Sequence, residues 1–353
     1  MIFGPENLYF RICGIVPIEG FYRCFYCVIP LALTCLVIAS PLLRDYGLLM
    51  HYWLGVLPQA LGNMIHLLMI LFDPEEFRSI LHDLNLVDDQ LREMGALIQS
   101  PNLTKTMAVI ILSQLFALLK SLTLLADMLA DYPNMITMFV IINAAWNQHL
   151  TFAQLIHSRF SALNDQLTRI AASADQTLLQ IVETRLDSVF RIHSTLHVIV
   201  SNVNSHFCVF NLFYVTFCFF EVVFYSYKTL DQMINDKAVV DMELKVIVYL
   251  SVNLVCQIVT CHLCANEANR TAEIAHHILH RDSPYSLWEK IGNYSRLTID
   301  NPVKFTVGGI FTFNMELLTK IAAMSFSYLV IIFQLKDVDL FVPMSTSVNA
   351  TGN

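Results

Sequence analysis

Long stretches without charged residues are the feature that most limits how this chain can fold. With histidine set aside, seven stretches carry at most two charged side chains each, at residues 24–43, 46–72, 106–126, 132–158, 192–227, 246–266 and 305–335. Each reaches the roughly 20 residues with which a helix crosses the hydrocarbon core of a bilayer. The sequence therefore predicts seven transmembrane spans.

The composition and the chemistry of the bilayer decide what these spans are. Hydrophobic residues make up 56% of the 353 residues and charged residues only 14%, whereas soluble domains are about a quarter charged. Backbone amides find no water in lipid, so a spanning segment must be a helix or part of a closed barrel. No β pattern competes with the helical one. We predict an all-α, multi-pass protein of the plasma membrane, in contact with the lipid bilayer.

Long connections between spans have a helical pattern of their own. In residues 74–94, Pro74 with Glu75 and Glu76 makes a favourable first turn. Apolar residues follow every three or four positions, at Phe77, Ile80, Leu81, Leu84, Val87, Leu91 and Met94. The segment 158–197 repeats this pattern at Phe160, Leu163, Leu167, Ile170, Leu178, Ile181, Leu186, Val189 and Ile192. Such apolar faces need a partner, which predicts a helical layer outside the membrane.

Charge gives an orientation and excludes one class of partner. Lys and Arg are more numerous on the segments that share a side with the N-terminus, although these segments are also longer. The positive-inside rule then favours a cytoplasmic N-terminus. Seven spans would place the C-terminus outside, where Asn349 of an Asn-Ala-Thr sequon could be glycosylated. The net charge of −8 comes without a basic cluster, so we expect no nucleic-acid partner.

The last span carries a recognisable motif. Ser327 and Tyr328 are followed by five hydrophobic residues and then by Gln334 and Leu335. This resembles the signature of the insect gustatory receptors, relatives of the insect olfactory receptors and their co-receptor. The family's motif reads Thr-Tyr, five hydrophobic residues, then Gln-Phe, so Ser replaces Thr here and Leu replaces Phe. GGIFTFNMELL at residues 308–318 and NLYFRICGI near the N-terminus are also similar to the family.

The resemblance implies a seven-helix subunit with a cytoplasmic N-terminus, assembled as a homotetramer around a pore that the last helix lines. It implies one seven-helix unit over 1–353, divided as follows. The parts are a cytoplasmic N-terminus (1–23), spans 1 to 6 with an outer ligand pocket (24–265), cytoplasmic anchor helices (266–304), the pore-lining span (305–336) and an extracellular tail (337–353).

Spacing within the last span agrees with a pore. On a helix Ser327, Ile331, Gln334 and Leu335 share one face. Four copies would form rings of Ile and Leu that can dewet, beside a ring of amides that can replace an ion's water. The resemblance assigns the gate to Ile331 and Leu335 and the polar ring to Gln334. Cations such as Na, K and Ca would then pass without strong selection.

A ligand pocket needs apolar walls with a few polar groups. The outer halves of spans 2 to 6 supply Trp53, Phe116, Lys120, Asn143, Trp146, Gln148, Tyr214, Phe217, Phe220, Glu221, Tyr249 and Asn253. These would suit a small-molecule tastant, either a bitter plant compound or a sugar. Charged groups inside spans are functional candidates, so Lys120 and Glu221 either pair with each other or contact the ligand. Glu316 and Lys320 are spaced to pair along the last helix.

Other functions find less support in the sequence. A G-protein-coupled receptor would have the opposite orientation and an Asn-Pro-x-x-Tyr motif late in span 7. A secondary transporter would show repeats and broken helices in two halves. Two cysteine pairs, Cys24 with Cys27 and Cys261 with Cys264, have a spacing that can hold zinc. Both lie on apolar helices, so we interpret them as core residues. We expect no metal, cofactor, structural disulfide or enzymatic activity.

Overall fold

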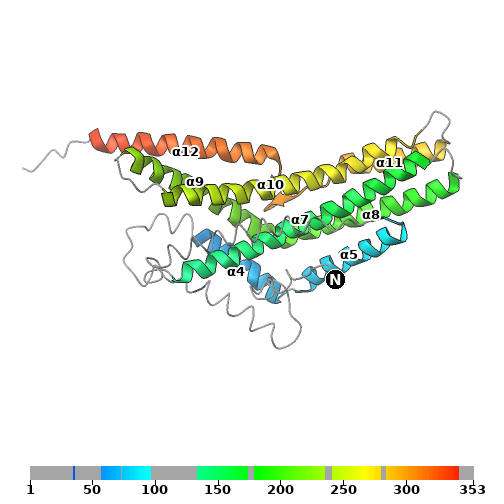
Figure 1. Cartoon of the computed structure of the whole chain (residues 1–353), viewed down its shortest axis with the longest axis horizontal. Helices are drawn as coiled ribbons and strands as arrows, with labels where there is room; N and C mark the ends of the chain where they lie inside the picture. The colour runs from blue at the N-terminus through cyan, green and yellow to red at the C-terminus, as the bar shows by residue number, and fades with distance from the viewer. Residues whose placement is uncertain are drawn as a thin grey trace, which may run out of the picture.

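The structure is a computed structural model that describes residues 57–72, 74–96, 133–173, 179–234, 241–279 and 284–341, together with Cys35. Helices make up nearly all of these residues, and they form an elongated molecule (Figure 1). In chain order the elements are α4 (Leu57–Phe72), α5 (Pro74–Glu93), α7 (Pro133–Ser173), α8 (Leu179–His206), α9 (Cys208–Ile234), α10 (Asp241–His276), α11 (Tyr285–Asp300), β1 (Thr306–Val307), β2 (Phe311–Thr312) and α12 (Met315–Phe341).

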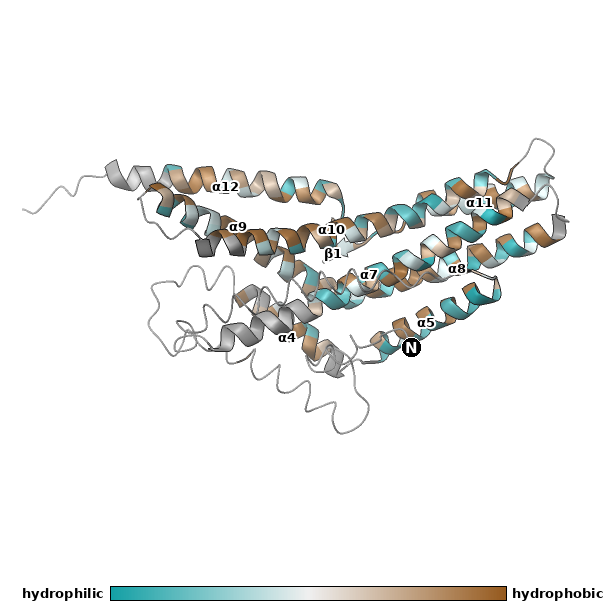
Figure 2. Ribbon diagram, viewed as in Figure 1, coloured by the Kyte–Doolittle hydropathy of each residue, from teal (hydrophilic) through white to brown (hydrophobic). Residues whose placement is uncertain are grey.

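The elements divide between two ends of the molecule. One end, which we call the layer, contains α5, α8, α11 and the C-terminal parts of α7 and α10 (Figure 1). The other end, which we call the bundle, contains α4, α9, α12 and the N-terminal parts of α7 and α10. Figure 2 shows hydrophobic residues along α9 and α10 in the bundle, and more hydrophilic ones along the helices of the layer.

Two long helices connect the layer and the bundle. α7 and α10 pack in parallel, because His149 bonds Gln257 at 2.7 Å in the bundle and Thr271 donates to Asn164 at 2.7 Å in the layer. Both helices are therefore continuous across the boundary between the two ends. A shift of either helix in the bundle is carried into the layer.

Three helices among the described residues are long and apolar enough to cross a membrane, at Cys208–Ile234, Ile247–His276 and Met315–Gln334. They match the last three predicted spans. α4 lies within the predicted span at 46–72, and the first part of α7 lies within the one at 132–158. The predicted spans at 24–43 and 106–126 lie outside the described residues, apart from Cys35.

The predicted fifth span, 192–227, is wrong in its first part. α8 ends at His206, α9 begins at Cys208, and the apolar membrane-crossing segment is Cys208–Ile234. Residues 193–206 contain His, Ser, Thr and Asn side chains without formal charge. A count of charges alone does not register these polar groups, so the predicted span began too early.

The predicted seventh span, 305–336, is wrong at its start, whereas the apolar crossing segment ends at Gln334, close to the predicted end. Residues 306–312 form a β-hairpin in which Thr306 pairs with Thr312 and Val307 with Phe311. Gly308 and Gly309 adopt positive φ angles of 58° and 70° in its turn, which glycine adopts readily. The last helix begins only at Met315 and continues past residue 336 to Phe341.

The predicted helix at 74–94 is confirmed as α5, and its predicted apolar face is buried except at Leu81 and Met94, which are half-buried. Phe77, Ile80, Leu84, Val87 and Leu91 are all 0% exposed. The helix ends at a glycine C-cap. Gly95 has φ 73°, its N–H donates to the Arg92 carbonyl, and the Ala96 N–H donates to the Leu91 carbonyl. This is the Schellman arrangement.

The predicted stripe over 158–197 is confirmed with one exception. Phe160, Leu163, Leu167, Ile170, Leu186, Val189 and Ile192 are buried. Ile181 is exposed, because the buried face of α8 runs through Val182, one position further along. Leu178 lies outside the described residues.

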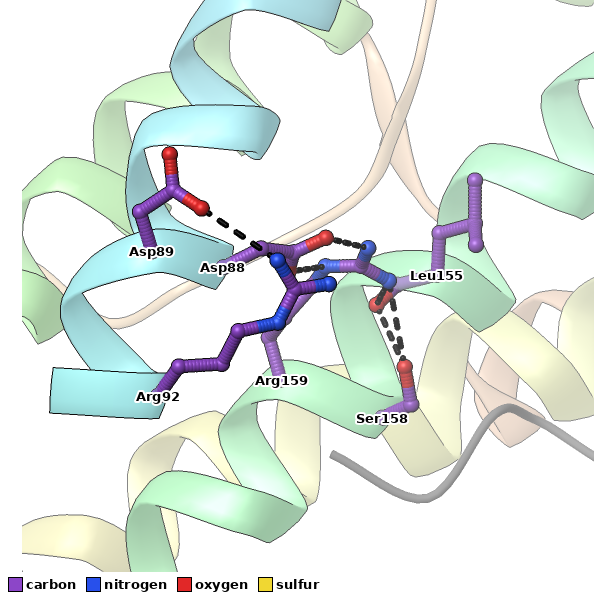
Figure 3. Close-up of polar contacts among 6 residues, drawn as sticks. All are labelled: Asp88, Asp89, Arg92, Leu155, Ser158 and Arg159. Carbon is purple, nitrogen blue, oxygen red and sulfur yellow. Dashed lines mark hydrogen bonds and ion pairs between the residues drawn. The ribbon is translucent and has the colours of Figure 1, made fainter. Parts of the chain in front are cut away.

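A buried ion pair joins α5 to α7 inside the layer (Figure 3). The Arg159 guanidinium donates to both carboxylate oxygens of Asp88, at 2.8 and 2.7 Å. The same guanidinium donates to the Leu155 carbonyl at 2.8 Å. Two parallel bonds fix both the distance and the orientation of the partners. Next to it on the surface, Arg92 pairs with Asp89 at 3.3 Å.

Two asparagines hold the segment between α11 and α12. Asn204 of α8 donates to the Lys304 carbonyl at 2.7 Å and accepts the Thr306 N–H at 3.0 Å. Asn269 of α10 makes the same pair of bonds to Val303, at 3.2 and 2.9 Å. Each amide pairs with the backbone as a neighbouring strand would. The start of α12 is thereby tied to α8 and α10.

Candidate functional site

α12 begins with a cap and buries only a narrow face. The Asn314 side chain accepts the Leu317 N–H at 3.0 Å, which satisfies a free donor of the first turn. Leu317, Ile321 and Ser325 are buried. In the apolar, membrane-crossing part of this helix only 17% of the residues are buried within the chain, whereas the corresponding share for α9 is 44%. Most of α12 therefore faces something other than its own subunit.

A continuous stripe of α12 carries the predicted pore residues. Ser327, Ile331 and Gln334 are all exposed, and they follow at intervals of four and three, so they share one side of the helix. The Leu335 side chain lies outside the described residues. Glu316 and Lys320 continue this stripe toward the start of the helix. Their predicted pairing is confirmed, with Lys320 Nζ 2.6 Å from Glu316 Oε1.

The motif's tyrosine has a different environment from its glutamine. The Tyr328 ring meets Phe219 of α9 edge-on, with centroids 5.7 Å apart. Phe333 packs against Tyr227 of α9 at 5.4 Å. These contacts hold α12 against α9. The motif therefore combines residues that fasten the helix with residues that it leaves uncovered.

The predicted ligand residues of α9 lie on one buried face. Tyr214, Phe217 and Glu221 are buried, at intervals of three and four. The Tyr214 ring lies 6.0 Å from the Trp146 ring of α7. Phe220 is half-buried and contacts Phe219 instead, at 5.4 Å. The structure thus brings Tyr214 to Trp146, places Phe217 and Glu221 further along the same buried face of α9, and places Phe220 apart.

α10 adds Asn253 at the same level of the bundle. Trp146 lies one turn before His149, Asn253 lies one turn before Gln257, and His149 and Gln257 are bonded to each other. Tyr249 is half-buried one further turn along the same face of α10. We call Trp146, Tyr214, Phe217, Glu221 and Asn253 the bundle site. Its members are three aromatic side chains, one carboxyl and one amide, and all five are buried.

Two donors of the bundle site are buried without a protein partner among the described residues. They are Trp146 Nε1 and Asn253 Nδ2. Burial of a donor without an acceptor costs about 1–3 kcal/mol. A bound molecule with an acceptor group would recover this cost. The site is therefore chemically suited to a small amphipathic ligand.

Gln148, although fully buried, leaves α7 in another direction. It is two positions after Trp146, which is about 200° around the helix. Trp53, Phe116, Lys120 and Asn349 lie outside the described residues, as does the side chain of Asn143. The pairing of Lys120 with Glu221 therefore stays a prediction.

Comparison with known proteins identifies the family. A profile of the 7tm chemosensory receptors matches residues 7–339, nearly the whole chain. The chain belongs to this family. Two solved structures of the insect olfactory receptor OR5 from Machilis hrabei, one in complex with eugenol, are similar to this receptor. Each superposes with a TM-score of 0.67 at 12% identity, over 93% of this chain and 96% of that one. No curated protein matches the sequence.

The match gives the architecture of the whole receptor. It is a seven-helix, multi-pass membrane protein, as the uncharged stretches predicted. The family is one of chemosensory receptors. At 12% identity, the two solved structures carry the fold alone.

Sequence reasoning missed a buried polar trio in this receptor. His149 of α7, Asn211 of α9 and Gln257 of α10 are 0% exposed and hydrogen-bonded to one another. Histidine was set aside in counting charges, and uncharged amides do not interrupt a hydrophobic stretch. The signal that could have found the trio is the presence of one amide or imidazole at mid-span in each of three helices.

The layer of the receptor holds titratable groups whose pKa values are changed by burial. His193 of α8 is bonded through Nε2 to the Ala268 carbonyl at 3.0 Å. Burial lowers the pKa of His193 to about 4. Burial also raises the pKa of Tyr294, which stacks on Phe190 at 3.8 Å. These side chains are packed as neutral groups.

The second of the two predicted cysteine pairs fits a core role. Cys261 and Cys264 are fully buried, and burial is what small apolar thiols favour. The six described cysteines are free thiols. Within the described ranges no three His, Cys, Asp or Glu side chains converge as a metal site. Cys24 and Cys27 lie outside those ranges.

Proposed function

We propose that this receptor is a gustatory receptor that acts as a tastant-gated, non-selective cation channel of the plasma membrane. The observation that carries the proposal is the uncovered stripe of α12, where Ser327, Ile331 and Gln334 are exposed on a membrane-crossing helix. An amide exposed to hydrocarbon would be costly. At a water-filled axis the same amide replaces part of an ion's hydration.

Four copies around one axis would complete the pore. The four Ile331 side chains would form a ring around the axis, and this constriction excludes water when it is narrow. Leu335 would lie beside it, and the four Gln334 side chains would form the polar ring. Glu316 lies on the same stripe at the start of the helix and would place carboxylates at the mouth of the pore. Each of these carboxylates is paired with Lys320 on the same stripe, so the ring of Gln334 amides would be the group that passes cations such as Na, K and Ca.

The layer offers a surface through which subunits would assemble. Tyr285, Trp288 and Leu297 of α11 are exposed although α11 is outside the membrane-crossing helices. An open groove of about 750 Å³ lies beside them between α8 and α11, and Tyr294 and Phe190 form part of its wall. Exposed apolar patches of this kind mark protein contacts. A homotetramer would cover them, with the layer on the cytoplasmic side and Asn349 outside.

The bundle site would bind the tastant. Its aromatic walls suit a plant compound with a ring, and its amide and carboxyl groups suit hydroxyl groups, so a bitter compound or a sugar would fit. The relative from Machilis hrabei was solved in complex with eugenol, a small aromatic compound. Occupancy of the site would draw α12 outward and widen the ring at Ile331 and Gln334.

Recording from cells that express this chain alone tests the proposal. Eugenol, sucrose and quinine are applied as probes of three chemical classes, and whole-cell current is measured with inhibitors of G-protein signalling present. An inward cation current supports the channel. A response that disappears with those inhibitors, or no current with a surface-expressed chain, contradicts it.

Two substitutions separate the pore from the pocket. Gln334→Ala should alter conductance or ion preference while assembly stays intact. Trp146→Ala should shift agonist sensitivity while single-channel conductance stays unchanged. A change of conductance in the Trp146 variant would remove that residue from the pocket.

A further inference from the structure

The buried polar trio lies next to the bundle site, on the side that faces the layer. Each member of the trio lies one helical turn from a residue of the bundle site, on the side away from the layer. His149 lies one turn from Trp146 on α7, Asn211 one turn from Tyr214 on α9, and Gln257 one turn from Asn253 on α10. This holds for all three helices because α9 runs opposite to α7 and α10. Each member of the trio is therefore on the same rigid turn as a residue of the site. A ligand that displaces any of the three helices displaces a member of the trio.

The three side chains of the trio are bonded closely enough to move together. Gln257 Nε2 lies 2.7 Å from His149 Nδ1 and donates to Asn211 Oδ1 at 3.4 Å. Asn211 Nδ2 lies 3.3 Å from His149 Nε2. A broken bond in this buried position leaves a polar group without a partner, which is costly. The helices therefore shift as a unit, or the trio changes to a second arrangement.

On the layer side, the trio meets the segment that starts the pore helix. The His149 ring contacts Phe305 at 6.1 Å and Phe313 at 5.7 Å between centroids. These phenylalanines flank the β-hairpin and are bonded to each other, since the Phe313 N–H donates to the Phe305 carbonyl at 2.8 Å. Asn314, which caps α12, follows immediately. Movement of His149 is thus passed to the first turn of α12.

The hairpin is fixed on its other side, so it cannot absorb the movement by sliding. Asn204 holds it by two bonds. The Gly308 turn lies against Leu212 of α9, and a Cβ added at Gly308 would come within 3.0 Å of the Leu212 side chain. The hairpin is therefore a short, fixed connection through which a displacement of the trio reaches α12.

We propose that His149, Asn211 and Gln257 are positioning residues that couple occupancy of the bundle site to the opening of the α12 pore, through Phe305 and Phe313. The proposal rests on the channel function proposed above. It assigns the coupling to direct contacts and requires no change in the ligand contacts or in the pore lining. Coupling of this kind between two sites typically changes an equilibrium by roughly 5- to 150-fold.

Single-channel recording without added compound tests the coupling and needs no identified ligand. The ratio of open to closed time is measured for wild type, for Gln257→Met, for Phe313→Leu and for the double variant. Gln257→Met keeps the side-chain length and removes both bonds of the amide. We expect each single variant to change the ratio by roughly 5-fold or more, and the double variant to depart from the product of the two, because the residues act through one path. Conductance should stay at the wild-type value.

A matched control separates coupling from general damage. Asn164→Leu removes a buried amide of the layer that bonds Glu267 and Thr271 but touches neither the trio nor the hairpin. It should leave the ratio within roughly twofold. If Gln257→Met does not reach the membrane, Asn204→Ala takes its place, since Asn204 is only half-buried and its loss opens no core cavity.

The outcomes are distinguishable. Variants that reach the surface and gate as wild type, or whose effects simply multiply, overturn the coupling while the channel stands. The coupling is also overturned if Asn164→Leu changes the ratio of open to closed time as much as Gln257→Met does. A surface-expressed wild-type chain that never opens, even with eugenol, sucrose or quinine, overturns the channel and the coupling with it.

Discussion

The layer and α12 satisfy their side chains in opposite ways. In the layer, five apolar residues of α5 are fully buried, and each of the three guanidinium nitrogens of Arg159 is bonded within the same chain. In α12, by contrast, Ile331 is 48% exposed and Phe326 is 70% exposed. Apart from exposed apolar residues such as Trp288 of α11, the layer packs within one subunit, whereas α12 needs lipid, water or other subunits to cover it.

This difference separates the residues that determine stability from those that determine function. Substitutions in the layer should unfold the receptor and affect the pore only indirectly. Substitutions on the uncovered stripe of α12 should change permeation and leave folding nearly intact.

Removing one partner of the buried ion pair should have the largest effect. Asp88→Ala leaves the Arg159 guanidinium buried without its carboxylate, at a cost of about 3–5 kcal/mol. The neighbouring Asp89→Ala removes only the exposed pair with Arg92 and should cost about 0–1 kcal/mol. The melting temperature of detergent-purified receptor measures both. Equal melting temperatures for the two variants would show that the layer is not held by this pair.

Matched isoleucines compare the two regions directly. Ile80 of α5 is 0% exposed and Ile331 of α12 is 48% exposed. Ile80→Ala should destabilise by about 2–5 kcal/mol through a core cavity, whereas Ile331→Ala should change stability by less than about 0.5 kcal/mol yet alter gating. Thermal melting and single-channel recording are made on both. The contrast fails if Ile331→Ala melts as early as Ile80→Ala.

Acid should weaken the layer through His193. Its pKa is lowered to about 4 by burial, whereas an unfolded histidine titrates near 6.5. Between these two pH values His193 is protonated in the unfolded chain and neutral in the folded chain. Stability is therefore lost as pH falls from about 6.5 and is fully lost from this group below about 4, at about 1.4 kcal/mol per pH unit.

His193→Gln tests this assignment, because Gln can still donate to the Ala268 carbonyl but does not titrate. Its melting temperature should fall less than that of wild type between pH 7 and pH 5. Parallel pH profiles for the two proteins would assign the acid sensitivity to other groups.

Gln334→Ala should have the smallest effect on stability, less than about 0.5 kcal/mol, because Gln334 is exposed and contacts no core. Its effect should fall on ion preference, measured from reversal potentials in mixed Na and Ca solutions. Unchanged permeation would remove Gln334 from the pore.

Local patterns in the sequence were enough to predict α5, because a proline and two glutamates start the helix and the three-and-four spacing fixes its buried face. The seven-span plan followed from charge alone. The hairpin before α12 did not, since a glycine pair in an apolar stretch looks like a continuing span until its backbone angles are known. The break at Phe207 was hidden for a similar reason, because the polar residues before it carry no charge.

The bundle site was only partly predictable. Residue type and depth pointed to Trp146, Tyr214 and Asn253, and the helix packing does bring their levels together. The same criteria also selected Gln148 and Phe220, which point elsewhere, because direction depends on how each helix is rotated. The trio around His149 depends on the register of three helices, which no single stretch of sequence contains.

Accessibility of cysteines placed along α12 tests directly whether the uncovered stripe of this helix faces a water-filled pore. Ser327→Cys, Ile331→Cys and Gln334→Cys lie on the uncovered stripe, and Ser325→Cys, on the buried face of the same helix, is the matched control. With the wild-type chain as background for its nine native cysteines, a charged water-soluble thiol reagent is applied while channels are open. The account predicts that current is blocked for the three stripe positions and not for position 325. Stripe cysteines that stay unreactive in open channels, or that react no faster than position 325, would contradict it.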